Sequence, residues 1–364
     1  MRIIIAGGGT GGHLYPGIAI AEELKKRDMN NEILFVGAPY GIEQKVLPKE
    51  GYQLRMIDVK GIVGLGIRGK MKALTKLPVA FYKSYHIIKD FKPDVVVGVG
   101  GYSSGPIVQV ACLLGIPTLI HEQNSIPGLA NRILGRFVDA VAISFPVSAS
   151  FFSTKKVTFT GNPTRKIFRT ISKEEALRKM GIDEGLFVVF VVGGSKGAHR
   201  INCLIVEAAE YLSCAKNHLQ IIHQTGDKDH PWVVDEYNKK GFKSVVIPFI
   251  EDIASVYAVA DLVIARAGAS TISEITISGK PSVLIPYPYA ASNHQEINAR
   301  VLSDSGASEV VLERDIDVEK FAEMVLSLIQ DKKRLEDMSN KASMLGRSDA
   351  AEKVVDLIYR IQKK

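Results

Sequence analysis

The chain has 364 residues, enough for about two domains with separate hydrophobic cores. Hydrophobic residues make up 46% and charged residues 23% of the chain, a composition that excludes disordered and fibrous proteins. Lys and Arg number 46 against 39 Asp and Glu, so the net charge of +7 favours anionic partners without choosing among them. The three cysteines are too few and too scattered for a disulfide framework or a zinc site.

No stretch of the sequence is interpreted as an export signal or a membrane span. The apolar run at 3–6 is too short for the core of a signal peptide. Residues 95–120 carry no charge and are long enough to cross a bilayer. A glycine- and serine-rich turn at 100–106 and Pro117 interrupt them, so the backbone would be unsatisfied in lipid, and we expect a soluble protein.

Each half of the chain opens with a strand, a glycine turn and a helix. The first half has an apolar strand at 3–6, glycines within 7–13 and a helical pattern at 16–27. The second half repeats this order with a strand at 186–192, a turn at 193–198 and a helix at 201–212. Short apolar runs alternating with helices are typical of parallel strands buried on both faces; the further runs lie at 33–36, 95–99, 118–121, 140–144, 219–223, 244–247, 262–265 and 282–285.

The pattern predicts an α/β protein with two Rossmann-like, doubly wound parallel-sheet domains in tandem. A turn cluster at 160–163 marks the boundary, which gives domains 1–162 and 163–344. The final amphipathic helix at 350–362 could pack on either domain.

The first glycine turn matches the dinucleotide-binding pattern Gly7-x-Gly9-x-x-Gly12. The strand at 33–36 is not followed at once by a carboxylate that could hold a ribose, which argues against a nicotinamide cofactor. Two interpretations stay open, a turn that only packs helix on strand and a turn whose N–H groups bind a phosphate. His13 ends this turn at the edge where ligands bind in open α/β sheets, so it is a candidate catalytic residue.

Two further strand ends carry polar residues. Residues 121–124 are His, Glu, Gln and Asn, which packing alone does not explain. After the strand at 262–265, we expect Ser or Thr to cap a helix, with Glu274 in its first turn. Glu274 could accept hydrogen bonds from a ribose diol, or it could only stabilise the helix end.

No metal or cofactor is predicted. The Asp-x-Asp triplets at 227–229 and 315–317 are interpreted as solvated surface. No other group of His, Cys and Asp residues has the spacing of a metal site.

Several short motifs occur in order along the chain, namely Gly8–His13, Gly100–Pro106, His121–Asn124, Gly161–Arg165, Gly193–Ala198, Arg266–Glu274 and His294–Ala299. Together they resemble, from end to end, the MurG family of GT-B glycosyltransferases. The resemblance implies two Rossmann-like domains facing across a cleft, with the helix within 345–364 packing back on the N-terminal domain.

The resemblance also implies a reaction. GlcNAc would move from UDP-GlcNAc to the 4-hydroxyl of MurNAc in undecaprenyl-diphosphate-MurNAc-pentapeptide, with inversion, in peptidoglycan synthesis. The enzyme would act as a peripheral protein at the cytoplasmic face of the cell membrane and serve cell-wall growth, cell shape and division.

The matching motifs imply roles for individual residues. The acceptor diphosphate would rest on the turns at 9–12 and 100–105. His13 would be the general base, with Glu122 as the alternative. The remaining substrate contacts would be Ser195, Ala269, Ser270 and Thr271 for the UDP diphosphate, Glu274 for the ribose, Ile250 for uracil with Arg165 nearby, Gln295 and Asn124 for the sugar, and Thr10, Gly11 and Gly12 along the cleft. The assignment of His13 as base is our own hypothesis, made because an inverting transfer needs one base for the acceptor hydroxyl.

A lipid acceptor calls for membrane contact. An apolar, glycine-rich loop at 61–70 leads into a helical pattern flanked by basic residues, which favours docking on an anionic membrane surface. The alternative is a helix whose apolar stripe joins the core, and Pro78 complicates both interpretations. The expected contacts are Ile62, Leu65, Ile67, Arg68, Lys70, Lys72, Leu74 and Phe81.

Three rival functions are weighed against this one. They are another nucleotide-sugar enzyme such as an epimerase or a glycolipid transferase, a nicotinamide-dependent oxidoreductase, and a non-catalytic polyanion binder. The missing ribose carboxylate argues against the second. The spread of basic residues without a long basic run argues against the third, and no nucleic-acid partner is expected.

Overall fold

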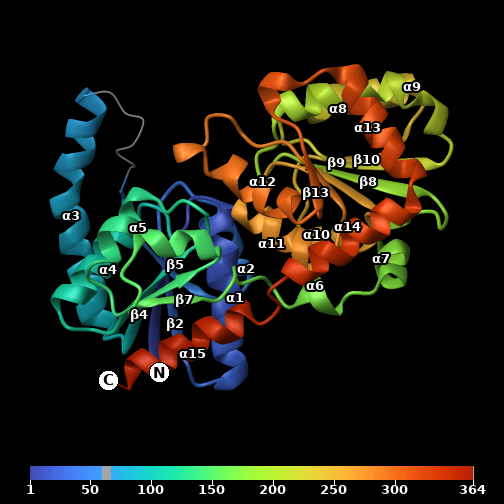
Figure 1. The fold of residues 1–364 in the computed structure, drawn as a ribbon. Helices are drawn as coiled ribbons and strands as arrows, with labels where there is room; N and C mark the ends of the chain where they lie inside the picture. The colour runs from blue at the N-terminus through green and yellow to red at the C-terminus, as the bar shows by residue number, and fades with distance from the viewer. Residues whose placement is uncertain (60–66, 364) are drawn as a thin grey trace. The chain divides into compact units, whose positions relative to one another are not determined.

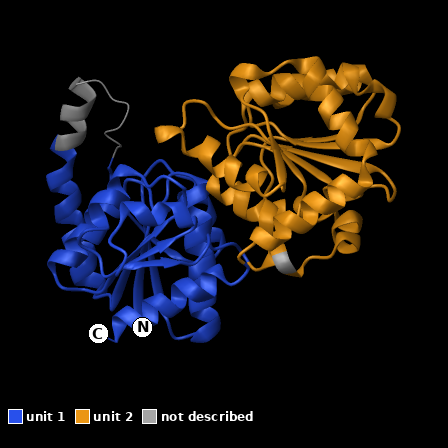
Figure 2. Ribbon diagram, in the orientation of Figure 1, with its two compact units in different colours: residues 1–165, 348–364 blue, residues 166–347 orange. Residues whose placement is uncertain are grey.

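The computed structural model of the chain describes residues 1–59 and 67–363, without the side chains of 67–74 and 169. The chain forms two compact units (Figure 2). Unit 1 comprises residues 1–165 and 348–364, and unit 2 comprises residues 166–347.

Unit 1 contains a seven-stranded parallel sheet in the order β3-β2-β1-β4-β5-β6-β7. Its strands are β1 (Arg2–Ala6), β2 (Glu32–Gly37), β3 (Gln53–Met56), β4 (Val95–Gly98), β5 (Thr118–Glu122), β6 (Ala140–Ile143) and β7 (Val157–Phe159). Its helices, drawn around the sheet in Figure 1, are α1 (Gly11–Arg27), α2 (Glu43–Lys49), α3 (Ile67–Phe91), α4 (Ser104–Leu113), α5 (Leu129–Leu134), η1 (Pro146–Phe151) and α15 (Ala350–Gln362).

The central strands of unit 1 are apolar because they face a core on each side of the sheet. Ile3 and Ile5 of β1 point into the cluster that includes residues of α1 and α15. Ile4, between them, points into the other cluster, which includes residues of α3 and α4. Successive side chains of a strand alternate between faces, so an uninterrupted apolar run buries both, and helices cover both.

Unit 2 contains a six-stranded parallel sheet in the order β10-β9-β8-β11-β12-β13. Its strands are β8 (Phe187–Val192), β9 (Leu219–Gln224), β10 (Lys243–Ile247), β11 (Leu262–Ala265), β12 (Ser282–Leu284) and β13 (Ser308–Val310). Its α-helices are α6 (Ile167–Thr170), α7 (Lys173–Met180), α8 (His199–Tyr211), α9 (His230–Lys240), α10 (Ile253–Val259), α11 (Ala269–Ile277), α12 (His294–Asp304), α13 (Val318–Gln330) and α14 (Lys332–Leu345).

The predicted fold class, α/β with two Rossmann-like parallel-sheet domains, is confirmed. Strands β3 and β13 were not predicted, because these edge strands lack an apolar run. Helix α1 was predicted to begin at about Pro16, but it begins at Gly11 and Pro16 lies inside it. Helix α3 likewise continues through Pro78.

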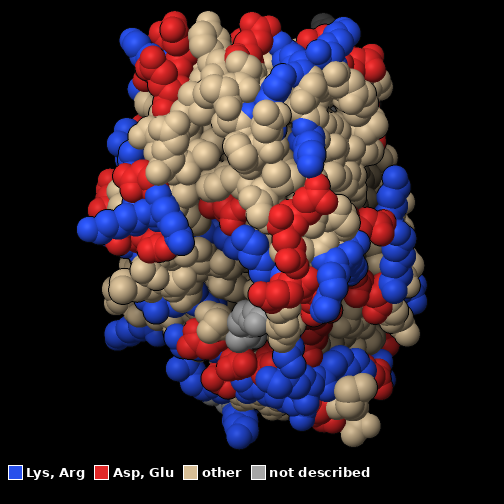
Figure 3. Space-filling model, turned by 90° about the vertical axis from the view of Figure 1, so that its right-hand side faces the viewer, with Lys and Arg blue, Asp and Glu red and all other residues tan. Residues whose placement is uncertain are grey.

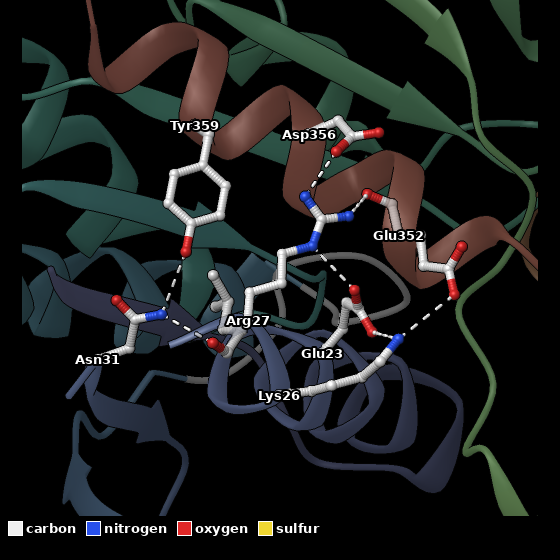
Figure 4. A network of polar contacts seen from close by, with 8 residues as sticks. Glu23, Lys26, Arg27, Asn31, Glu352, Asp356 and Tyr359 are labelled. Atoms are coloured by element: carbon white, nitrogen blue, oxygen red, sulfur yellow. Dashed lines mark hydrogen bonds and ion pairs between the residues drawn. The ribbon is translucent and has the colours of Figure 1, made fainter. Parts of the chain in front are cut away.

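Helix α15 belongs to unit 1 and packs against α1 (Figure 4). Arg27 of α1 donates to Asp356 at 2.6 Å, to the carbonyl oxygen of Glu352 at 3.0 Å and to Glu23 at 2.8 Å. The apolar stripe of α15, which includes Ile358, is buried in the same core as β1. The last segment of the chain is therefore part of the N-terminal core. In the part of the chain that the structure describes, no helix is long and apolar enough to span a membrane.

We expect the apolar stripe of α15, rather than its ion pairs, to stabilise unit 1. Ile358 is fully buried, so Ile358→Ala should lower the free energy of unfolding by about 2–5 kcal/mol. The Asp356 side chain is 66% exposed, so Asp356→Ala should cost less than about 1 kcal/mol. Urea unfolding of both variants measures the difference, and equal losses would contradict this account.

Candidate functional site

Two glycine turns of unit 1 touch each other where β1 and β4 end. The strand order reverses direction between these two strands, and ligands of open α/β sheets bind outside the carboxyl ends of strands at such a point. A Cβ atom at Gly101 would lie 2.6 Å from the carbonyl oxygen of Gly8, and one at Gly7 would lie 2.7 Å from that of Gly100. Only glycine permits this approach. The residues just before the predicted acceptor turn at 9–12 are therefore in contact with the start of the predicted acceptor turn at 100–105.

His13 lies at the meeting point of these turns. It is the third residue of α1, and its ring is half-buried. A Cβ atom at Gly100 would lie 2.7 Å from His13 Nδ1 and 3.2 Å from Gln123 Oε1. The end of β1, the turn after β4 and the end of β5 thus bring His13, Gly100 and Gln123 together. The other predicted residues of this turn are exposed Thr10, which precedes α1, buried Gly11 and half-buried Gly12.

Behind His13, a buried polar network joins three strand ends. Gln123 donates to the carbonyl oxygen of Val99 at 2.6 Å and lies 3.2 Å from His121 Nδ1. His121 Nε2 lies 3.2 Å from the carbonyl oxygen of Gly161. Burial lowers the pKa of His121 to about 4; the hydrogen bond to Gly161 acts in the opposite direction, and the electrostatic interaction with His13 lowers the pKa by a smaller amount. A neutral His121 ring that donates to Gly161 and accepts from Gln123 fits both the pKa and the geometry.

Glu122 organises the loop that follows β5. Its side chain is buried and accepts hydrogen bonds from the N–H groups of Asn124 at 2.9 Å and Gly128 at 3.3 Å and from the Asn131 amide at 2.8 Å. Burial raises the pKa of Glu122, and these hydrogen bonds act in the opposite direction. Both carboxylate oxygens are therefore committed to the loop that carries Asn124.

Arg165 lies in unit 1, at the end of its first segment. Its guanidinium group stacks over the ring of Tyr15 of α1, 4.6 Å from the ring centroid. A cation over an aromatic face in this geometry is held by the ring quadrupole. Arg165 is thus brought to the same helix end as His13.

A carboxylate that the sequence analysis did not find lies at the first glycine turn. Glu43, at the start of α2, accepts a hydrogen bond from Gly9 N–H at 2.9 Å and one from Ala38 N–H at 2.8 Å. No carboxylate directly follows β2 in the sequence, but the side chain of Glu43 returns to the end of this strand in the folded chain. The glycines at 37 and 41 that make room for it were the available signal.

In unit 2, the residues predicted to bind the nucleotide sugar lie at the carboxyl ends of the strands. They follow neighbouring strands in spatial order: Ile250 after β10, Ser195 after β8, residues 269–274 after β11 and Gln295 after β12. Ser195 is exposed in the turn before α8. Ala269 is buried, whereas Ser270, Thr271 and Glu274 are half-buried. The Gln295 side-chain oxygen accepts from Tyr287 N–H at 2.9 Å, which fixes its orientation.

Gln224, at the end of β9, joins two parts of this edge. Its side chain is buried and donates to the carbonyl oxygen of Gly194 at 2.9 Å. Its own oxygen accepts from Ile250 N–H at 2.9 Å. One amide therefore sets the position of the Ser195 turn relative to Ile250, a role that the sequence analysis did not assign.

The start of α11 differs from the expectation. Gly268, not Ser or Thr, occupies the N-cap position, and no side chain caps the helix. Ser270 and Thr271 lie in the first turn, and Glu274 lies one turn further on. The prediction that Glu274 lies in the first turn was wrong because the helix begins at Ala269. Burial and, after it, the charge of Glu274 raise the pKa of Tyr257 in α10.

Asp229 is not the solvated surface residue that was expected. Its carboxylate lies 2.9 Å from His199 Nδ1 and accepts from the Asn202 amide at 2.8 Å. The Asn202 amide also donates to the carbonyl oxygen of Thr225 at 2.9 Å, and this oxygen lies next to the Ser195 turn. Among residues 1–59 and 67–363, no group of three or more His, Cys, Asp and Glu side chains is arranged to hold a metal ion.

The structure describes only some of the residues predicted to contact the membrane. Ile62 and Leu65 lie outside the described residues. Ile67, Arg68, Lys70, Lys72 and Leu74 lie in the first part of α3, whose side chains are not described. Phe81 is partly buried and packs against the core cluster that contains Ile4, as the alternative interpretation expected.

Comparison with known proteins first defines the class. Residues 3–143 match the glycosyltransferase family 28 N-terminal domain, and residues 188–354 match the C-terminal domain of the same family. The chain thus has the two domains of a glycosyltransferase.

The particular family follows from full-length relatives. The chain is 47% identical over 364 residues to the UDP-N-acetylglucosamine--N-acetylmuramyl-(pentapeptide) pyrophosphoryl-undecaprenol N-acetylglucosamine transferase of Thermodesulfovibrio yellowstonii, with 100% of both chains covered. It is 49% identical to the protein of that name from Syntrophus aciditrophicus, covering 98% of this chain and 97% of the relative. The chain belongs to this transferase family, and the resemblance inferred from the motifs is confirmed.

Comparison with solved structures supports the same assignment. The crystal structure of Acinetobacter baumannii MurG aligns with a TM-score of 0.76 at 30% identity, covering 99% of both chains. A UDP-N-acetylglucosamine 2-epimerase aligns with a TM-score of 0.71 at 13% identity, which shows a shared fold and nothing more.

The low pKa of His121 predicts a pH dependence of stability. The unfolded chain binds a proton on this histidine below a pH of about 6.5, while the folded chain does not until about pH 4. The free energy of unfolding should therefore fall as the pH drops through this range, by about 1.4 kcal/mol per pH unit from this group. His121→Gln should make the decline shallower by that amount between pH 6 and pH 5, as measured by urea unfolding.

The matched control is His86→Gln, because His86 is exposed on α3. It should leave the slope of the wild type unchanged. An unchanged slope in His121→Gln would show that this ring is not held neutral.

Proposed function

We propose that the chain transfers GlcNAc from UDP-GlcNAc to the 4-hydroxyl of MurNAc in undecaprenyl-diphosphate-MurNAc-pentapeptide, with inversion. The observation that carries this proposal is the full-length similarity to curated transferases of that name at 43–49% identity. In this proposal unit 1 takes the lipid-linked acceptor and unit 2 takes the nucleotide sugar.

His13 is the proposed general base. It is half-buried, next to Gly100, at the edge where the two acceptor turns meet. Glu122, the alternative base, is 2% exposed, and both of its oxygens accept hydrogen bonds from the loop after β5. A base must reach the proton that it removes. The accessibility of His13 therefore favours it, and Glu122 is better explained as the group that positions Asn124.

The reaction is then a single displacement. His13 takes the proton of the MurNAc 4-hydroxyl while the oxygen forms a bond to the anomeric carbon of GlcNAc. The bond from that carbon to the UDP oxygen breaks, and the configuration at the carbon inverts. Charge develops on the leaving diphosphate, so donors placed there in advance lower the barrier.

The turns of unit 2 are suited to that charge. The Ser195 turn precedes the thirteen-residue helix α8, and Ser270 and Thr271 lie in the first turn of α11. Helix N-termini present N–H groups and a partial positive charge to anions. We assign the diphosphate to these two helix ends, the ribose to Glu274 and the uracil to the backbone of Ile250. The N–H of Ile250 is held by Gln224, so its carbonyl oxygen is the proposed contact.

The test is UDP release with a short-chain lipid-diphosphate acceptor. Wild-type protein should release UDP from UDP-GlcNAc only when this acceptor is present, and a metal chelator should not stop the reaction. His13→Ala should slow the single-turnover rate by about 10²–10⁴ through the loss of its base. Release of UDP without acceptor, as in an epimerase or hydrolase, would contradict the proposed function.

Two results refine the roles. If His13→Ala keeps the wild-type rate, His13 is not the base. Glu122→Gln should lower stability. The N–H donors of the loop now bond two carboxylate oxygens, and a Gln side chain offers them only one oxygen. A loss of rate in Glu122→Gln larger than that in His13→Ala, at unchanged stability, would exchange the two roles.

We further propose that unit 1 docks on the cytoplasmic face of the membrane as a peripheral protein. Helices α3, α4 and α5 pack side by side (Figure 1), and each is associated with exposed apolar side chains. These include Tyr82, Leu113 and Ile133, which are 66%, 75% and 49% exposed. Lys83 and Lys89 of α3 and Arg136 are also exposed, and each basic residue near an anionic leaflet contributes about 1 kcal/mol.

The charged residues on another face of the protein do not indicate a further anionic partner. On the face shown in Figure 3, Lys and Arg are interspersed with Asp and Glu rather than gathered in one basic patch. This mixture supports the view that no nucleic acid is bound there.

Docking predicts that Leu113→Gln combined with Ile133→Gln weakens binding to liposomes containing anionic phospholipid. Loss of two inserted apolar side chains should reduce affinity by about tenfold or more in co-sedimentation. Met344→Gln is the matched control, since Met344 is 77% exposed in unit 2. Equal binding by all three proteins, or binding that does not depend on anionic lipid, would contradict docking through this surface.

A further inference from the structure

Glu43 is a buried carboxylate at the first glycine turn that the proposed chemistry does not use. It is fully buried at the start of α2. Its Oε2 accepts from Gly9 N–H at 2.9 Å, and its Oε1 accepts from Ala38 N–H at 2.8 Å. A negative charge buried beside a turn suited to anions needs an explanation, because it opposes the binding of a phosphate.

The surrounding backbone is shaped to admit this carboxylate. A Cβ atom at Gly8, Gly37 or Gly41 would overlap its oxygens. Gly8 and Gly9 have φ angles of +154° and +88°, and the hydrogen bond to Glu43 holds Gly9 in its left-handed conformation. Glycines from two separate segments, the first turn and the stretch from the end of β2 to α2, thus make room for one side chain.

The contact also removes a donor from the turn. The single N–H of Gly9 points to Glu43 and cannot also bind a phosphate oxygen while the carboxylate remains. In dinucleotide-binding folds, the glycine turn receives the pyrophosphate and a carboxylate after the second strand binds the ribose. Here the carboxylate after β2 binds the turn itself, so neither function is open to a dinucleotide.

We propose that Glu43 is a positioning and specificity residue of the acceptor site. It fixes the turn at 8–9, withdraws the Gly9 amide, and so directs a lipid-linked diphosphate to the N-terminus of α1 beside His13 while excluding a dinucleotide. This inference rests on the proposed assignment of the acceptor diphosphate to the turns at 9–12 and 100–105.

The test separates the acceptor from the donor. Glu43→Gln keeps the shape of the side chain but replaces one acceptor oxygen with an NH₂ group. This NH₂ group cannot accept the hydrogen bond that Gly9 N–H or Ala38 N–H now donates. We expect KM for the lipid acceptor to rise about tenfold, and KM for UDP-GlcNAc to change by less than about twofold. In ¹⁵N-glycine-labelled protein, the Gly9 amide proton should shift upfield as it loses its charged acceptor.

Two further variants complete the design. Glu23→Gln is the matched control, because Glu23 is a buried glutamate of the same unit that bonds Lys26 and Arg27 instead of the turn. It should leave both KM values unchanged. Gly41→Ala places a methyl group on the Glu43 carboxylate and should raise the acceptor KM in the same way, which supplies the test if Glu43→Gln does not fold.

The outcomes are distinct. If Glu43→Gln and Gly41→Ala fold and keep the wild-type acceptor KM, the inference is overturned even where the Gly9 resonance moves. Equal rises in both KM values would also overturn it, because they indicate a general structural role. If the wild-type protein itself transfers no GlcNAc to the lipid acceptor, the proposed function fails, and the amide shift alone tests the contact.

Discussion

The arrangement of this protein depends on one property of parallel sheets, which is that all strands end at the same edge. The turns that follow neighbouring strands must therefore lie side by side, and their backbone groups must be satisfied close together. In unit 1 this brings the glycine turns after β1 and β4 into contact and places His13 beside Gly100. In unit 2 it aligns Ile250, Ser195, the start of α11 and Gln295 along one edge.

The sequence predicted those features that are local along the chain. Apolar runs located the central strands, and glycines directly after strands located the turns. The edge strands β3 and β13 were missed because exposed edges need no apolar run. The start of α11 was misjudged because Gly268, rather than a hydroxyl side chain, takes the cap position. Helix starts depend on a few backbone angles that the residue types favour only weakly.

The residues that hold the site together could not be predicted, because their contacts are distant in sequence. Glu43 is separated by 34 residues from Gly9. Gln224 lies 30 residues from Gly194 and 26 from Ile250. Neither Glu43 nor Gln224 belongs to a motif that contains its partner. The sequence pattern alone predicts a surface helix at Glu43 and a strand end at Gln224, where a polar residue is ordinary. Only the fold shows that they are buried and hydrogen-bonded.

The two units fix their first glycine turns in opposite ways, and the difference fits their proposed ligands. In unit 1 a carboxylate accepts from Gly9, which removes an N–H donor from the turn. In unit 2 the Gln224 amide donates to the carbonyl oxygen of Gly194, which also accepts from Gly197 N–H, so Gln224 itself takes no N–H donor from that turn. An anion needs N–H donors and is repelled by carboxylates and carbonyl oxygens. By this reasoning the turn of unit 2 is the better diphosphate site, as the proposed transfer requires of its leaving group, whereas the turn of unit 1 is restricted to an anion bound closer to the start of α1.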